Sequence, residues 1–174
     1  MNERITEDIV YDVLKINQEK YPKVTIEKQQ SKNLRITKLL KNASKQGGDG
    51  TGKPEFIITF DEIPDLVIVI ECKADVKKHE SKNRDKPKDY AVDGVLLYSE
   101  YLAKEFDVIA VAVSGEKKSE LKISTFLQLN SQKMIDKSDV KILDFASYVS
   151  LYKKDPEKEK KRYFKTDEVF KKTS

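Results

Sequence analysis

The sequence predicts one α/β domain with three layers, in which helices cover both faces of a central mixed sheet. Three observations favour this class. Residues 4–19 place apolar side chains on one stripe at helical spacing. Residues 56–60 and 66–70 are short, almost wholly apolar runs joined by turn residues, as expected of two buried strands. A third apolar run, residues 107–115, follows a helical segment, which favours a parallel strand added by a crossover.

The first part of the chain supplies two predicted helices and a short strand. The proline of Tyr21-Pro22 ends the first helix, because proline disfavours helical geometry in the residue before it. Residues 24–26 are expected to be extended, and residues 31–43 to form the second helix. The side chains expected to be buried are Ile5, Ile9, Val10, Val13, Leu14 and Ile16 on the first helix and Leu34, Leu39 and Leu40 on the second.

Two predicted loops separate the remaining elements. Residues 46–52 hold four of the six glycines but precede a strand, so they predict a flexible loop rather than a phosphate-binding loop. Residues 75–89 have almost no large apolar residues, which predicts a mobile surface loop with His79 in solvent. Gly94 would let the helix of residues 90–106 approach the sheet closely. The other predicted elements are strands or edge elements at 121–129 and 140–145 and a helix at 146–152.

Composition limits the class of protein. Hydrophobic residues make up 38% of the 174 residues and charged residues 37%, with a net charge of +4. A single cysteine excludes an internal disulfide and fits a cytoplasmic location, and no run approaches the ~20 apolar residues of a membrane span. Residues 1–155 are expected to form the domain. Residues 156–174 are expected to be a charged linker or C-terminal extension, which suggests a fragment of a larger enzyme.

The candidate site lies where the two central strands end in charge. Glu55 precedes the first run, while Glu71 and Lys73 close the second, where burial alone gives no reason for ionisable groups. A hairpin centred on Ile63 puts Glu55 opposite Glu71, with Cβ atoms ~5 Å apart on one face. Lys73, two residues farther on, points to that same face. The alternative, a purely structural ion cluster, is disfavoured because an exposed ion pair adds little stability and a buried one can cost more than it returns.

These residue types indicate metal-assisted chemistry on a phosphodiester. Opposed carboxylates repel unless a cation lies between them, and Mg²⁺, or Mn²⁺ in its place, prefers such oxygens. Lys73 would orient the attacking water or stabilise the transition state. The backbone carbonyl of Cys72 would add an oxygen, while its side chain is expected in the core. Glu7 has two equally weighted interpretations: a first-turn acid favoured by the helix dipole, or a carboxylate at the rim of the site.

Asp65 is a second acidic residue to weigh against Glu55. It lies six residues before Glu71 on the same predicted strand, which separates the two by ~20 Å. They cannot share a metal if that strand is continuous, so Glu55 is preferred.

The spacing of these residues resembles a known signature. Pro54-Glu55, a gap of 15 residues and Glu71-Cys72-Lys73 look like the PD-(D/E)xK motif of restriction-type nucleases. Residues 52–58 with 71–75 resemble the N-terminal nuclease domain of Type I and Type IIG restriction enzymes, and the similarity extends from the first helix to about Phe145. One departure is Glu55, where the superfamily usually has Asp. Thr6-Glu7-x-x-Val10 looks like the first-helix segment whose Glu often joins the metal site.

The resemblance implies a restriction-endonuclease-like fold and a Mg²⁺-dependent DNA endonuclease, the cleavage module of a Type I or Type IIG restriction–modification enzyme. Its implied partners are double-stranded DNA and methyltransferase, target-recognition or motor domains; whether cleavage needs a dimer stays open. The alternative is a catalytically inactive nuclease-like domain that binds DNA or a protein. The family places a polar site residue on the helix of Asp93 and Tyr98. Candidate DNA contacts are Lys53, Lys77, Lys78 and Arg84, although charge alone favours a solvated lysine-rich surface.

Overall fold

The computed structural model describes residues 2–45 and 50–155. The chain divides into two compact units, Met1–Leu143 and a second that begins at Asp144. Most of the predicted glycine loop, at 46–49, and the predicted linker at 156–174 lie outside the described residues. Among the helices that the structure describes, none has the length and apolar character needed to span a membrane.

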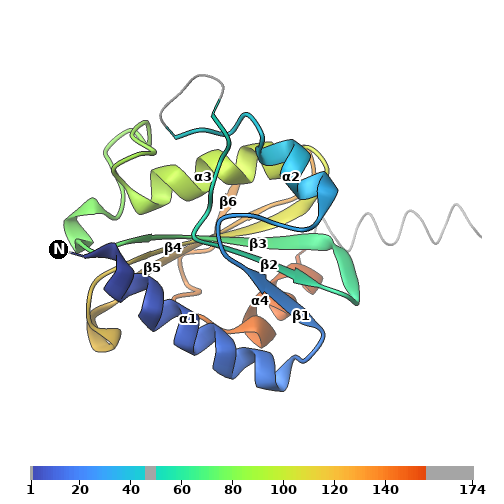
Figure 1. The fold of residues 1–174 in the computed structure, drawn as a ribbon, viewed down its shortest axis with the longest axis horizontal. Coiled ribbons are helices and arrows are strands. Elements are labelled where there is room, and N and C mark those ends of the chain that lie inside the picture. The colour runs from blue at the N-terminus through green and yellow to red at the C-terminus, as the bar shows by residue number, and fades with distance from the viewer. Residues whose placement is uncertain (1, 46–49, 156–174) are drawn as a thin grey trace, which may run out of the picture. The chain divides into compact units, whose positions relative to one another are not determined.

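A six-stranded mixed sheet forms the centre of the first unit (Figure 1). Its strands lie side by side in chain order, and all neighbours are antiparallel except β3 and β4, which run parallel. The predicted parallel pairing is therefore confirmed. The strands are β1 (Val24–Glu27), β2 (Phe56–Phe60), β3 (Ile63–Lys73), β4 (Asp107–Ser114), β5 (Lys122–Gln128) and β6 (Ile135–Asp136).

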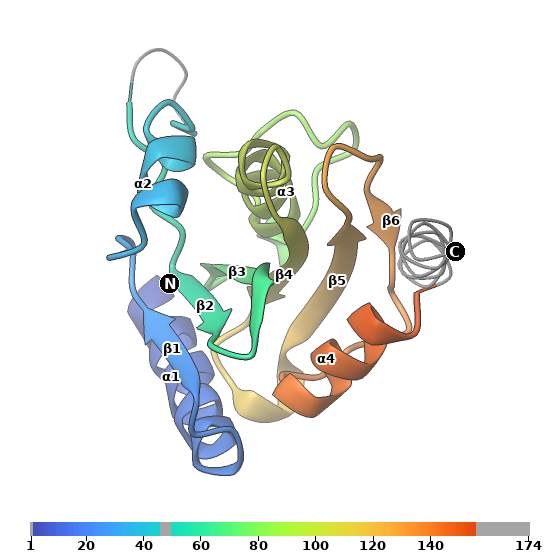
Figure 2. The same cartoon turned by 90° about the vertical axis from the view of Figure 1, so that its right-hand side faces the viewer.

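Helices cover both faces of this sheet, which confirms the predicted three-layer α/β class. Helix α1 (Glu3–Lys20) lies on one face, and α2 (Leu34–Leu40) and α3 (Ala91–Leu102) lie on the other (Figures 1 and 2). Side chains of α2 and α3 form one apolar core with the strand residues that point toward them, including Ile57, Val67 and Val69. Short 3-10 helices occupy Val76–Lys78 and Lys118–Glu120.

The hairpin of β2 and β3 has the predicted register. Phe56 pairs with Ile70 and Thr59 with Val67, so the hairpin is centred on Ile63 until a bulge between Thr59 and Phe60 shifts the pairing. Side chains alternate between faces along a strand, which places Glu71 on the same face as Val67 and Val69, toward α3. Strand β3 is continuous, so Asp65 and Glu71 lie far apart along it, as predicted.

Helix α1 buries a more polar face than its sequence predicts. Asn2 caps the helix by accepting a 3.0 Å hydrogen bond from the backbone N–H of Arg4. The buried side chains are Thr6, Val10, Leu14 and Asn17, whereas Ile5 and Ile16 are 43% and 55% exposed. The buried polar groups are satisfied: Thr6 Oγ1 donates to Gly115 O at 2.6 Å, and Asn17 Nδ2 donates to Leu143 O at 3.1 Å.

Two other element predictions are wrong. The second helix is shorter than predicted because Asn33 caps it, and Leu34, expected in the core, is 83% exposed as its first residue. No strand forms at 140–145. Asp144 instead accepts a hydrogen bond from the backbone N–H of Ser147 and starts α4 (Phe145–Lys153), the predicted closing helix of the second unit. The cap at Asp144 accounts for Phe145, which begins the helix, while residues 140–143 are in neither a helix nor a strand.

Candidate metal centre

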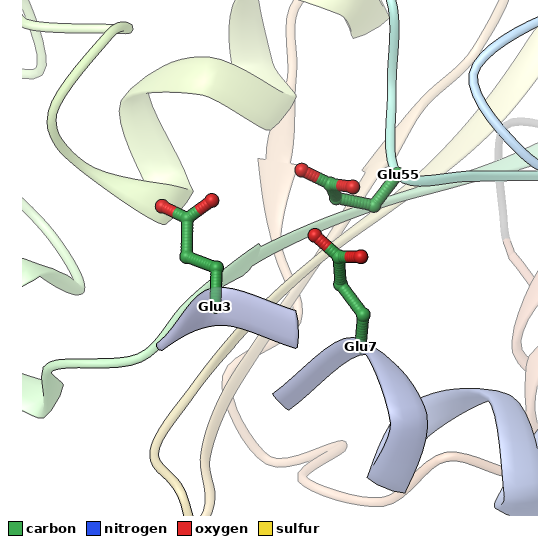
Figure 3. Close-up of side chains that lie close together, drawn as sticks. All are labelled: Glu3, Glu7 and Glu55. Carbon is green, nitrogen blue, oxygen red and sulfur yellow. The ribbon is translucent and has the colours of Figure 1, made fainter. Parts of the chain in front are cut away.

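Three carboxylates from two separate segments gather at the end of the sheet where β3 ends. Glu3 and Glu7 lie one helical turn apart on α1, and Glu55 immediately precedes β2 (Figure 3). One oxygen from each lies within 4.8 Å of the other two. Thr6 holds α1 in this position, because its hydroxyl bonds the backbone just beyond β4, at Gly115.

The acidic cluster favours a positive charge. Burial, then the negative charge of Glu71 and a hydrogen bond with Glu7, raise the pKa of Glu55 to about 8. Two oxygens bound to one Mg²⁺ lie at most ~4.2 Å apart, so small side-chain rotations would bring the three carboxylates around one ion. These hard oxygen donors fit Mg²⁺ or Mn²⁺, with Glu3, Glu7 and Glu55 as the residues placed to hold it.

Glu71 is adjacent to this cluster, but its carboxylate has other partners. The residue is fully buried, Oε1 accepts a 3.2 Å hydrogen bond from the backbone N–H of Glu55, and Oε2 forms an ion pair with Lys45. Gly94 on α3 leaves room for it, because a Cβ at that position would lie 3.1 Å from Oε2. Burial raises the pKa of Glu71, and the positive charges of Lys45 and Lys73 oppose that shift.

Lys73 lies between helix α1 and the loop that follows β3. Its Nζ donates to Glu3 Oε1 at 2.8 Å and to Lys88 O at 3.0 Å. The side chain is only 14% exposed, so the ammonium is held in place rather than free in solvent. The hairpin thus brings Lys73 next to the carboxylates as predicted, and its direct partner is Glu3 rather than Glu55 or Glu71.

Cys72 lies between these two charged residues. Its side chain is fully buried, and burial raises the pKa of its thiol well above the ordinary value. The expectation of a core side chain is confirmed. Whether its backbone carbonyl binds a metal stays a prediction.

The loop after β3 is built around His79, which the sequence wrongly predicts to be solvated. His79 is 2% exposed, and its two ring nitrogens lie 2.8 Å from Ser114 Oγ and Ser124 Oγ. Asp93 is also buried, and it accepts hydrogen bonds from Ser81 and from the backbone N–H of Lys86. Both residues fasten the loop to the sheet and to α3.

Tyr98, the other α3 candidate, is 1% exposed and packs in the core. Lys45 Nζ lies 5.9 Å from the centroid of its ring. Tyr98 therefore contributes a wall beside the Lys45–Glu71 pair, whereas Asp93 holds the loop. Neither is placed as a ligand of the three-carboxylate cluster.

The candidate DNA contacts have different surroundings. Lys53, Lys77 and Lys78 are exposed, and Lys78 Nζ lies 5.0 Å from the Tyr90 ring centroid. Arg84 is half-buried and already has partners: it donates to Glu80 at 3.0 Å and stacks 5.2 Å from the Phe126 centroid. The three lysines are exposed to solvent, whereas Arg84 contributes to the structure of the loop. Whether any of them contacts DNA stays a prediction.

Two site residues were missed from the sequence. Glu3 lies four positions before Glu7, a spacing that puts both on one helix face, so that signal was present. Lys45 had no comparable signal, because it lies in the segment after α2 and reaches Glu71 only through the tertiary fold.

The six-stranded mixed sheet with helices on both faces is an α/β fold, consistent with a restriction-endonuclease-like domain. The chain is 34% identical over 106 residues to the Type II restriction enzyme and methyltransferase RM.BcgI of Heyndrickxia coagulans. The matching part covers 53% of this chain and 16% of that relative, so the chain corresponds to a small part of the relative's length. The similarity supports a relationship to restriction enzymes. No family model matches the chain, and no solved structure matches it.

Proposed function

We propose that this chain is a divalent-metal-dependent DNA endonuclease domain and the cleavage module of a restriction–modification enzyme. The observation that supports this most directly is the gathering of Glu3, Glu7 and Glu55 beside Lys73 at one end of the sheet. The similarity to an enzyme named as both restriction enzyme and methyltransferase supports the same context. The PD-(D/E)xK assignment, with Glu55 in the place of Asp, belongs to this proposal.

Each charged group has a distinct role in the proposed reaction. A bound Mg²⁺ would polarise the scissile phosphate and lower the pKa of the attacking water. Glu3, Glu7 and Glu55 supply the oxygens that hold such an ion, and Glu71 contributes negative charge behind Glu55. Lys73, held beside Glu3, orients the water or stabilises the charge that develops on the phosphate.

A plasmid assay tests the proposal. Supercoiled DNA is incubated with the full chain in Mg²⁺ or Mn²⁺ and, in parallel, in EDTA. Nicked or linear DNA is expected in the reactions that contain the metal and not in the reaction that contains EDTA. Glu55→Gln should remove the activity, while Asp65→Asn, which changes an exposed acid elsewhere on the hairpin, should retain it.

A domain that binds DNA without cutting is the competing function. It would give a DNA complex in a gel-shift assay but no product in either metal, even when the chain is joined to the rest of the enzyme. That result would refute the endonuclease proposal.

A further inference from the structure

Lys45 pairs with Glu71 in the described part of the site, but it belongs neither to the sequence signature nor to the proposed metal ligands. Its role is therefore unexplained so far. It follows α2, and its ammonium forms an ion pair with Glu71 Oε2. Glu71 is fully buried, and Lys45 is 21% exposed, so this pair is shielded from water far better than an ordinary surface ion pair.

The field around Lys45 comes from the whole acidic site. Burial alone would lower the pKa of Lys45, but the charge and hydrogen bond of Glu71, with smaller contributions from Glu55 and Glu3, raise it. Lys45 and Lys73 together place two ammonium groups against Glu71 and Glu3. A cation bound by the carboxylates would thus meet the positive charge of Lys45 and compete with it for Glu71.

We propose that Lys45 is a built-in counter-ion of the carboxylate site, displaced from Glu71 when a divalent cation binds, and that it thereby sets the metal affinity. This inference rests on the proposed metal-dependent function. It follows that Glu71 becomes available as a metal ligand only as Lys45 moves away. If the Lys45–Glu71 pair were purely structural, replacing Lys45 would not change the metal affinity.

Calorimetric titration of the full chain with MnCl₂ tests the proposal. Lys45→Met removes the competing charge, so Mn²⁺ should bind at least ~10-fold more tightly, since a unit charge a few ångströms from a dication has a large effect. Lys41→Met makes the same change at an exposed lysine four residues earlier and should leave the affinity unchanged. Lys45→Arg keeps the charge and should not tighten binding.

Lys45→Met leaves the buried carboxylate of Glu71 without its partner and could therefore destabilise the fold. A second variant is needed that removes the charge and still folds. Lys45→Gln removes the charge but keeps a donor amide for Glu71, and it should show the same tighter binding. Mn²⁺ should also raise the melting temperature of Lys45→Gln by more than it raises that of the wild type. In a Glu71→Gln background, the gain from Lys45→Gln should shrink several-fold, because the contested ligand is gone.

The outcomes separate this inference from the proposed function. Wild-type Mn²⁺ binding with no tightening in Lys45→Gln or Lys45→Met overturns the counter-ion role and leaves the metal-dependent function standing. No Mn²⁺ binding by the wild type or any variant overturns both. An equal gain in the Lys41→Met control would show a general charge effect and also overturn the inference.

Discussion

Lys73 is the group that the proposed reaction assigns to the reacting phosphate. Its side chain is largely shielded, and its ammonium is fixed by Glu3 and by the backbone carbonyl of Lys88. A cation held by two partners is preorganised, and preorganised charge stabilises a transition state more effectively than a mobile side chain does. Glu3 therefore has two roles in the proposed site, as a metal ligand and as the residue that positions Lys73.

Replacing Lys73 should separate catalysis from binding. Lys73→Ala is expected to fold and to bind Mn²⁺ and DNA, while its rate of plasmid cleavage falls by at least ~10², the scale of losing one electrostatic donor. Glu71→Ala should lose cleavage and bind Mn²⁺ more weakly, and Asp65→Ala should keep both. The measurements are initial cleavage rates and calorimetric Mn²⁺ titrations. Cleavage by Lys73→Ala at the wild-type rate would mean that the proposed site is wrong.

The α1 carboxylates allow a direct test of which acids hold the metal. Glu7→Gln removes one of the three clustered carboxylates and should weaken Mn²⁺ binding by about tenfold or more, since each hard oxygen ligand contributes to the affinity. Asp8→Asn is the matched control, because Asp8 is the exposed next residue on the same helix. Equal Mn²⁺ affinities of these two variants, measured by calorimetry, would place the ion away from α1.

Among the secondary-structure elements, the hairpin was predicted best and the connections least well. Strands β2 and β3 are almost wholly apolar runs bounded by charge, and the turn residues between them predicted a hairpin centred on Ile63. The burial of His79 could not be predicted, because the loop around it has few apolar residues and its partners, Ser114 and Ser124, come from β4 and β5. Lys45 was missed for the same reason: its partner lies on a distant strand.

The loop fastened by His79 should make stability depend on pH. Burial, and then the charge of Lys122, lower the pKa of His79 from 6.5 to about 4. The unfolded chain thus takes up a proton near pH 6.5 that the folded chain accepts only near pH 4. The His79 contribution to stability is full above about pH 7 and decreases as the pH falls toward 4, by at most ~3 kcal/mol.

Urea unfolding of the wild type and His79→Gln at several pH values measures this contribution. Glutamine does not titrate, so the stability difference between the two proteins should be largest near pH 7.5 and should narrow toward pH 4. Comparing the two proteins cancels the opposite trend expected from Glu55, whose raised pKa stabilises the folded chain as the pH falls. A difference that stays constant across this range would contradict the burial of a neutral imidazole.

For the molecule as a whole, charge distribution matters more than net charge. The chain carries only four more basic than acidic residues, so in the proposed function long-range attraction to DNA would be weak and local clusters would supply the phosphate contacts. Lys77 and Lys78 are adjacent and exposed, and they lie four and five residues beyond Lys73, the last residue of β3. These two lysines are therefore the candidate phosphate contacts of the proposed nuclease domain.

The salt dependence of DNA binding tests this contact surface. The slope of log affinity against log salt concentration becomes shallower by ~0.9 for each phosphate contact that is lost. The slope of the double variant Lys77→Gln/Lys78→Gln should therefore be shallower than that of the wild type by about 1.8. Lys20→Gln/Lys23→Gln is the matched control, since both lysines are exposed; Lys20 is the last residue of α1, ~25 Å from Glu3 along the helix, and Lys23 follows three residues later. Fluorescence anisotropy with a labelled duplex in Ca²⁺ measures the slopes while limiting cleavage. If the slope of Lys77→Gln/Lys78→Gln equals that of the control, the DNA approaches the carboxylates from another side.

Arg84→Gln should behave differently, because Arg84 contacts Glu80 and Phe126 within the protein. It should lower the melting temperature and leave the salt slope nearly unchanged.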